Sequence, residues 1–184
     1  MPFGRNAKTK KPLDEAALYG YAVKALGRHM RTEAELHRLM AARAEPEAGG
    51  EAAVRRVIAR LKEHGYLNDR TFAETYARLR QENEKLGARR VRQDLRQKGV
   101  RAELVEEAVA ARYGETSEEA LAREHLERKR IHKPENEKEA ARVMRRLVAA
   151  GFSVATIYRI LRNWDLPEEA LAGLETLDTD PHDE

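Results

Sequence analysis

The sequence repeats itself at an offset of 52 residues (147 − 95), and this repetition limits the fold more than any other feature. Leu95 aligns with Leu147, and both copies then read as two helices joined by a glycine turn. Four further landmarks align in the same register: Gly99 with Gly151, Val100 with Phe152, Val105 with Ile157, and Val109 with Leu161. Repetition of helical units indicates an array in which each unit packs mainly on its neighbours.

The first third of the chain fits the same pattern if residues 43–50 are an inserted loop. Apolar residues spaced three and four apart predict nine helices in groups of three. Capping boxes at Thr32–Glu35 and Thr116–Glu119 mark two helix starts. No segment alternates polar and apolar residues as a half-buried strand does. We therefore expect an all-α fold of three tandem three-helix repeats in an elongated, curved array.

The expected layout has five parts. They are a basic disordered N-terminal arm (1–13), three-helix repeats over 14–67, 68–114 and 115–165, and an acidic C-terminal tail (166–184). Hydrophobic residues make up 41% of the chain and aromatic residues only 5%, which suits three thin helical layers better than one thick core.

The aromatic residues are expected to serve mainly in the core. Phe72, Tyr76 and Leu79 share the buried face of the expected fourth helix, and Trp164 continues an apolar stripe in the ninth. Tyr66 is expected to fill a junction between repeats, the alternative being that it stacks on a nucleic-acid base.

No catalytic constellation is recognisable among the polar residues. The six histidines lack the His-Glu-x-x-His spacing of zinc enzymes, both serines are expected to cap helices, and no Gly-x-x-x-x-Gly-Lys loop is present. Cysteine is absent, which excludes disulfides and thiol catalysis. We therefore expect a protein that is not an enzyme and needs no metal or cofactor.

No stretch approaches the roughly 20 apolar residues that a membrane span needs. The first eleven residues carry four cations but lack the apolar core of a signal peptide. We therefore expect a cytoplasmic monomer without membrane contact.

The charges are segregated along the chain, although the net charge is only +3. Residues 87–101 carry six cations and one acid (+5), residues 102–119 carry six acids and one cation (−5), and the tail carries seven acids and no Lys or Arg (−7). Blocks of opposite sign favour oriented contact with a charged partner, such as nucleic acid or a nucleoprotein. The alternative is a solvated surface held by internal ion pairs.

Two basic clusters are the candidate binding residues. In the expected fifth helix, Arg89, Arg92 and Arg96 form one stripe at i, i+3 and i+7, which Arg90 and Lys98 widen. Guanidinium groups suit phosphates and carboxylates because their forked donors bind two oxygens at once. The alternative is that the stripe pairs with acids of the next helix, namely Glu103, Glu106 and Glu107.

The second cluster is Arg128, Lys129 and Arg130 with Lys133, at the expected end of the seventh helix next to Pro134. Cations at this position also complement the helix dipole, which is the structural alternative to partner binding.

Several segments resemble the RecX family of recombinase regulators. They are VIARLKEHGYLNDRTFA at 57–73, Tyr76, Gly87, LRQKGV at 95–100, and AGFS at 150–153 followed by Ile157. The match runs from about Ala16 to Trp164. The segment from Gly65 through Asp69 to Ala73 is fairly specific, and the others are weak alone. The chain departs from the family pattern in the Glu45–Glu51 loop, the basic N-terminal arm and the acidic tail.

The resemblance implies three tandem three-helix repeats and a cytoplasmic protein without a cofactor. It also implies a partner, the RecA recombinase filament, in whose helical groove family members bridge neighbouring subunits and restrain ATP hydrolysis, strand exchange and filament growth. Direct contact with single- or double-stranded DNA is a further expectation.

A rival interpretation is a helix-turn-helix transcription regulator, because a helix pair joined at Gly99 or at Gly151 has the required form. The second helix of such a pair presents polar side chains to base edges. The expected sixth helix instead offers Glu103, Glu106 and Glu107, whereas the ninth offers Arg159, Arg162 and Asn163. A helical scaffold for another protein is a third interpretation, favoured by the acidic tail.

Overall fold

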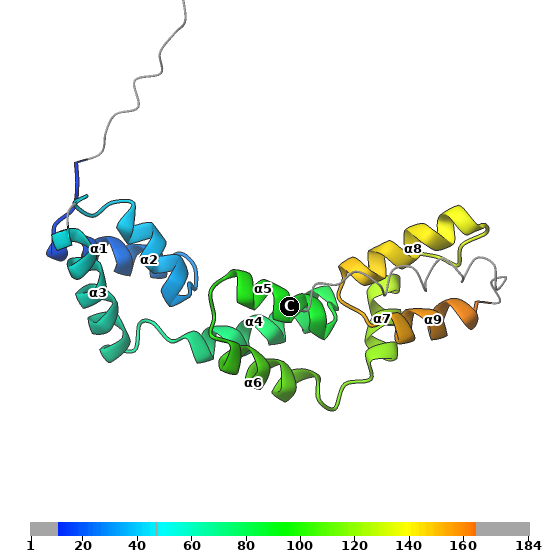
Figure 1. The fold of residues 1–184 in the computed structure, drawn as a ribbon. Helices are drawn as coiled ribbons and strands as arrows, with labels where there is room; N and C mark the ends of the chain where they lie inside the picture. Colours follow the sequence, from blue (N-terminus) through cyan, green and yellow to red (C-terminus); the bar gives the residue numbers. More distant parts are fainter. Residues whose placement is uncertain (1–10, 47, 165–184) are drawn as a thin grey trace, which may run out of the picture. The chain divides into compact units, whose positions relative to one another are not determined.

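The computed structural model describes residues 11–46 and 48–164, which form nine α-helices and no β-strand (Figure 1). The prediction of an all-α fold is confirmed. In chain order the helices are α1 (Glu15–Leu26), α2 (Glu33–Ala41), α3 (Ala48–Glu63), α4 (Asp69–Glu84), α5 (Ala88–Gln97), α6 (Ala102–Tyr113), α7 (Glu118–Arg128), α8 (Glu137–Ala149) and α9 (Val154–Arg162).

Contacts divide the chain into two compact units. The first unit comprises residues up to Phe72 together with the turn Lys98–Val100, and the second comprises Ala73–Gln97 and the residues from Arg101 on. The boundaries of the three repeats expected from the sequence remain a prediction.

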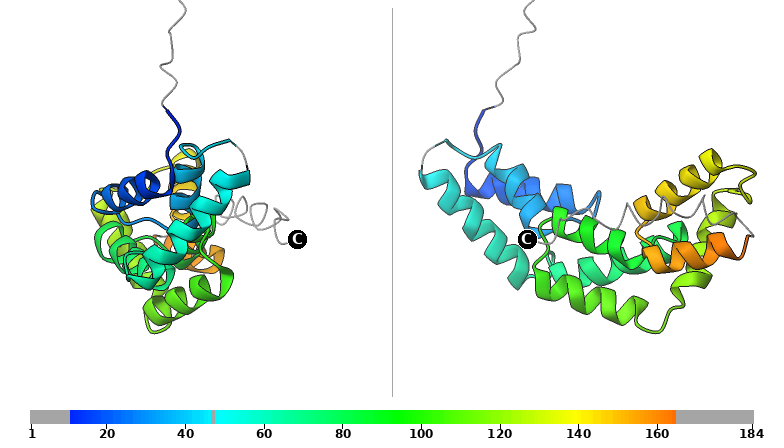
Figure 2. Two further views of the ribbon diagram at one scale, coloured as in Figure 1. Left: turned by 90° about the vertical axis from the view of Figure 1, so that its left-hand side faces the viewer. Right: turned by 45° about the vertical axis from the view of Figure 1, so that its right-hand side comes forward.

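In the first unit, α1, α2 and α3 pack on one another around a shared core (Figures 1 and 2). Most of the apolar residues that helical spacing places on the buried faces are buried: Leu18, Ala22, Leu36, Met40, Val54, Val57, Ile58 and Leu61. Four others expected there are only partly buried, namely Tyr21, Ala25, Leu26 and Leu39. The capping box at α2 is present, because the Glu35 amide donates to Thr32 Oγ1 (3.1 Å) and the Thr32 amide donates to Glu35 Oε2 (3.3 Å). Two of the first-turn amides of α2 are thereby satisfied.

Tyr66 does not fill a junction in the first unit. Its side chain is 57% exposed, whereas the next residue, Leu67, is buried in the core. Just before Tyr66, Gly65 ends α3 in the left-handed region with a φ of 72°.

In the second unit, α7 crosses the pair formed by α8 and α9, and the three share a core (Figures 1 and 2). Buried residues at its centre are Leu121, Leu126, Val143, Leu147, Phe152, Ile157 and Leu161. His125 is also buried, and its Nδ1 lies 3.1 Å from the carbonyl oxygen of Glu84. Burial lowers the pKa of His125, so the imidazole is neutral at neutral pH and donates this bond.

Two expectations for the second unit are wrong in register. Leu79 is 41% exposed, because α4 turns Ala73, Ala77 and Gln81 inward instead. The cap of α7 is Ser117, whose Oγ accepts from the Ala120 amide (3.3 Å), and not Thr116. The Thr116 hydroxyl binds Gln81 Nε2 (3.0 Å) and the Arg112 carbonyl (3.2 Å), so it is not available to cap α7.

The turns at Gly99 and Gly151 make the same type of contact, 52 residues apart. The carbonyl of Lys98 accepts from the hydroxyl of Thr32, the cap of α2 (2.6 Å), and the carbonyl of Ala150 accepts from the amide of Gly87, just before α5 (2.8 Å). Each turn glycine also has positive φ, 81° at Gly99 and 89° at Gly151. We call these two contacts the turn joints.

Each turn joint leaves no room for a side chain on its glycine. A Cβ at Gly99 would overlap the Cβ of Ala34, and a Cβ at Gly151 would overlap the amide nitrogen and Cβ of Arg90. Gly65 has the same left-handed backbone with open space around it. The repeated glycine of the sequence therefore serves two needs at Gly99 and Gly151, a left-handed turn and a close approach between segments.

We expect Gly99→Ala and Gly151→Ala each to lower the free energy of unfolding by about 2–5 kcal/mol, through left-handed strain plus overpacking. Gly65→Ala is the matched control and should lose only about 1–2 kcal/mol, because it pays for the backbone conformation alone. Urea denaturation of the three variants measures the difference. Equal losses at Gly65 and Gly151 would show that close approach contributes nothing.

Candidate partner-binding surfaces

The Arg stripe of α5 faces acids of α6 for part of its length. Arg92 Nε donates to both carboxylate oxygens of Glu106 (3.0 and 2.9 Å), and Arg96 Nη2 donates to the Oε1 of the same residue (3.1 Å). The side chain of Arg92 is 30% exposed and that of Arg96 is 57% exposed. Of the two alternatives left open by the sequence, internal pairing holds for these two arginines, through Glu106.

The two cations that widen the stripe also have internal partners. Arg90 Nε lies 2.9 Å from Asp94 Oδ1, one turn along α5. Lys98 Nζ lies 2.8 Å from Glu35 Oε1, and the ammonium sits 5.9 Å from the ring centre of Phe72. Because the Lys98 carbonyl also belongs to a turn joint, both ends of this residue bind within the first unit.

Arg89 differs from the rest of the stripe. It is exposed, and its side chain has no hydrogen bond or ion pair with any residue that the structure describes. Its charge is felt by Glu118, whose carboxylate accepts from the amide and hydroxyl of Ser153 (2.8 and 2.6 Å) and from the hydroxyl of Thr156 (2.6 Å). Burial opposes ionisation of Glu118, but these three bonds and the charge of Arg89 lower its pKa below the ordinary value.

The second cluster is exposed throughout. Arg128, Lys129 and Arg130 follow one another at the end of α7, and none of their side chains has an ion pair in residues 11–46 or 48–164. Arg130 has a φ of 52°, and the Ile131 amide closes the helix end by donating to the Leu126 carbonyl (2.9 Å). An arginine therefore occupies the left-handed position that glycine usually takes.

Beyond this cluster and Lys133 lie four further cations that the sequence interpretation did not assign to a surface: Lys138, Arg142, Arg145 and Arg146. Between residues 128 and 146 the chain has eight cations and three acids, a net charge of +5 (8 − 3). All eight are exposed and lack an ion pair within the described part of the chain: Arg128, Lys129, Arg130, Lys133, Lys138, Arg142, Arg145 and Arg146. We call this stretch the basic segment 128–146. Counting the charges of residues 128–146, as was done for residues 87–101, reveals this segment from the sequence alone.

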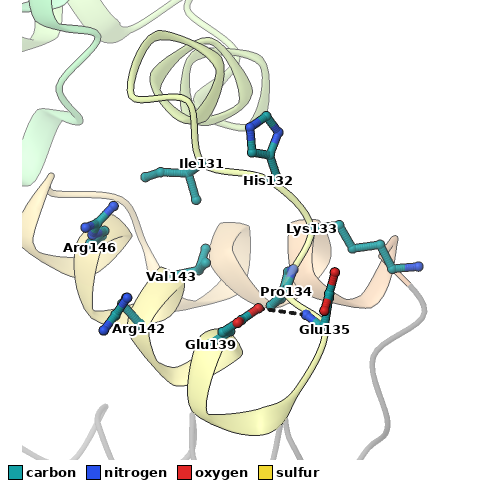
Figure 3. Close-up of a pocket in the computed structure, with 9 residues that line it drawn as sticks. All are labelled: Ile131, His132, Lys133, Pro134, Glu135, Glu139, Arg142, Val143 and Arg146. Atoms are coloured by element: carbon teal, nitrogen blue, oxygen red, sulfur yellow. Dashed lines mark hydrogen bonds between the residues drawn. The ribbon is translucent and has the colours of Figure 1, made fainter.

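The basic segment borders a cavity of about 310 Å³ between residues 131–135 and α8 (Figure 3). Ile131 and Val143 line it with apolar surface, and Arg142 and Arg146 lie on one side of Val143. On the other side, the Glu139 carboxylate accepts from the amide of Glu135 (3.0 Å).

Two features, a metal-binding cluster and a membrane-spanning helix, are absent from the described residues. No group of three or more His, Cys, Asp or Glu residues there is placed to hold a metal ion. Among these same residues, no helix combines the length and the apolar character that crossing a membrane requires.

Comparison with known proteins places the chain in a family. The regulatory protein RecX of Leptothrix cholodnii is 32% identical over 148 residues, which are 80% of this chain and 89% of that protein. The chain belongs to the RecX family. A RecX relative from Mycolicibacterium vanbaalenii is 33% identical over 150 residues, covering 80% of this chain and 78% of its own. A family model described as the second three-helix domain of RecX matches residues 68–109.

The fold comparison agrees. The crystal structure of RecX from Lactobacillus salivarius superposes with a TM-score of 0.61 at 22% identity, covering 84% of this chain and 98% of that one. This likeness shows that the chain has the same all-α fold as that RecX structure.

A charge swap tests the pairing of α5 with α6. Arg92→Glu with Arg96→Glu places three carboxylates together, and we expect it to lower the free energy of unfolding by about 1 kcal/mol, because the groups are partly exposed. Adding Glu106→Arg should restore most of the loss. Arg55→Glu is the control, at an exposed position of α3 without an ion pair among the described residues, and should leave the melting temperature unchanged. A double variant as stable as the wild type would contradict the pairing.

The hydrogen bonds of Glu118 predict acid sensitivity. Because its folded-state pKa is lowered, its contribution to stability is present above about pH 4.5 and is lost as the pH falls through the folded-state pKa. We expect Glu118→Gln to cost about 1–3 kcal/mol at pH 7 and to flatten the loss of stability below pH 4.5. Glu103→Gln, on the exposed face of α6, is the control. Identical pH profiles for Glu118→Gln and the wild type would contradict this account.

Proposed function

We propose that this chain binds the DNA filament of a RecA-type recombinase and thereby slows its ATP hydrolysis, strand exchange and growth. The observation that carries the proposal is membership of the RecX family over four-fifths of the chain. The resemblance in the segment 57–73 supports the same partner.

The charges of the chain suit a partner of mixed charge, because a nucleoprotein filament offers both phosphates and protein side chains. Arg89 and the basic segment 128–146 supply exposed cations that have no ion pair among residues 11–46 and 48–164. Exposed charges bind weakly one by one, but contacts linked through one chain add by effective concentration. Arg128, Lys129 and Arg130 are therefore proposed to contact the filament, together with Arg89.

Regulation of this kind needs no chemistry in the regulator itself. We propose that the chain acts as a cytoplasmic monomer, without catalysis, metal or cofactor. The hydrogen bonds of Glu118 and His125 support this, because they hold helices together: Glu118 binds Ser153 and Thr156 of the α9 start, and His125 binds the Glu84 carbonyl at the end of α4. Inhibition would be steric and conformational, since a protein that spans neighbouring subunits holds them in one geometry.

The rival proposal, sequence-specific DNA binding, meets acids in the second helix of one candidate motif and an internally bound arginine in the other, where Arg162 and Asn163 are exposed. In α6, Glu103, Glu106 and Glu107 are exposed and would repel phosphates. In α9, Arg159 is engaged by Glu119 (3.7 Å) and by the Thr156 hydroxyl (3.1 Å). A gel-shift competition in which affinity depends sharply on base sequence would favour the rival.

Titration of RecA's DNA-dependent ATPase with this protein is the decisive experiment. We expect inhibition at sub-stoichiometric amounts and no ATP hydrolysis by the protein alone. The variant Arg128→Glu/Lys129→Glu/Arg130→Glu should weaken filament binding by about 2–5 kcal/mol, because like charges would meet phosphates or acids that are partly desolvated. Unchanged rates at equimolar protein would reject the function.

A matched control has the same change in net charge at exposed cations of the first unit: Lys24→Glu/Arg38→Glu/Arg55→Glu. It should inhibit nearly as well as the wild type. If both triple variants lose inhibition equally, net charge decides binding and the assignment of Arg128–Arg130 is wrong.

A further inference from the structure

The cavity beside α8 combines two properties that select its ligand. The half-buried Ile131 and the edge of the buried Val143 line it with apolar surface (Figure 3). The guanidinium groups of Arg142 and Arg146 lie next to this surface and have no ion pair within the described part of the chain. A ligand that uses both must carry apolar side chains and negative charge within a few ångströms of each other. A nucleic-acid backbone supplies the charge but no aliphatic side chain, whereas an acidic peptide with leucines supplies both.

The chain itself contains such a peptide. Residues 166–184 have seven acids and no Lys or Arg, a charge of −7 against the +5 of the basic segment 128–146. Leu171, Leu174 and Leu177 are interspersed with Glu175 and Asp178. The tail therefore complements the cavity and the basic segment in both charge and apolar character.

The tail is attached where it can reach the cavity. It follows Trp164, which packs against the same core cluster as Ile131. Figure 1 shows that α9 ends toward the end of the α7–α9 group at which α8 begins. Twenty residues of extended chain span up to roughly 70 Å, whereas a helix of the length of α8 spans only about 20 Å.

We propose that the cavity beside α8 is a binding site for an acidic, leucine-containing peptide, and that the chain's own tail, residues 166–184, occupies it. Tail carboxylates pair with Arg142 and Arg146, and a leucine covers Ile131 and Val143. The bound tail thereby neutralises cations of the basic segment and lowers the affinity of that segment for other anions.

Acids already in the cavity restrict how the tail lies. Glu135 and Glu139 are on the side of Val143 away from Arg142 and Arg146, so like charges are excluded there and the tail carboxylates are directed to the two arginines. His132 and Lys133 complete the titratable groups of the lining. Because the tail is tethered, weak pairs are enough to hold it at the millimolar effective concentration typical of short linkers.

The test uses full-length protein and needs no recombinase, so its failure is distinct from failure of the proposed function. A neutral-tail chain carries Glu168→Gln, Glu169→Gln, Glu175→Gln, Asp178→Asn, Asp180→Asn, Asp183→Asn and Glu184→Gln. The probe is a fluorescent synthetic peptide with the sequence of residues 166–184, followed by anisotropy at low salt. We expect it to bind the neutral-tail chain about tenfold more tightly than the wild type, where the tethered tail competes.

Arg142→Glu/Arg146→Glu, added to the neutral-tail chain, should weaken peptide binding by about tenfold. Lys138→Glu/Arg145→Glu is the matched control on α8 with the same charge change outside the cavity, and should weaken it by about twofold, because separated surface charges are screened. The milder Arg142→Gln/Arg146→Gln should move in the same direction as its charge-reversed counterpart, which guards against a folding defect.

Three outcomes would overturn the proposal. The first is equal peptide affinity for the wild-type and neutral-tail chains. The second is an equal effect of the cavity variant and its α8 control. The third is that binding of a single-stranded oligonucleotide depends on Arg142 and Arg146 whereas binding of the peptide does not. That result would make the site a nucleic-acid contact.

Discussion

The architecture depends on the close approach of a glycine turn to the start of another helix. At each turn joint, a carbonyl of the turn accepts a hydrogen bond from a residue that precedes a helix, and the glycine beside it admits no side chain. At Gly87 the bond pairs a helix-start amide with a helix-end carbonyl, and at Thr32 the hydroxyl that caps α2 also satisfies the Lys98 carbonyl. The joint therefore contributes polar pairing as well as packing, which suits a chain with narrow apolar seams.

Local features of the fold were predictable because their causes lie within a few residues. Helical spacing identified the buried faces of α1 to α3, and the capping box at Thr32 is formed as expected. Tyr66, Leu79 and Thr116 were misplaced by local reasoning. For Thr116 a distant contact decided the outcome, its bond to Gln81, whereas Leu79 was misplaced because α4 turns Ala73, Ala77 and Gln81 inward instead.

The binding surface was harder to predict, because pairing between charges depends on how neighbouring helices face each other. The sequence showed that Arg92 and Arg96 are close to three glutamates but not which of them they bind; the structure assigns both to Glu106. The structure also makes the basic segment 128–146 a stronger candidate for partner binding than α5, because its cations have no ion pair among the described residues. Neither turn joint was foreseeable, since Gly99 and Ala34 are 65 residues apart (99 − 34).

That separation has a consequence for the order of folding. Contacts within α1–α3 or α7–α9 join residues that are near in the chain, whereas the hydrogen bond from Thr32 to Lys98 spans 66 residues. Closing a long loop lowers the chain entropy before any contact energy offsets this loss. We therefore expect helix triplets to form first and the joints to close last. In the native state the same joints would open before the triplets melt, so the amide of Gly87 would exchange its hydrogen without global unfolding.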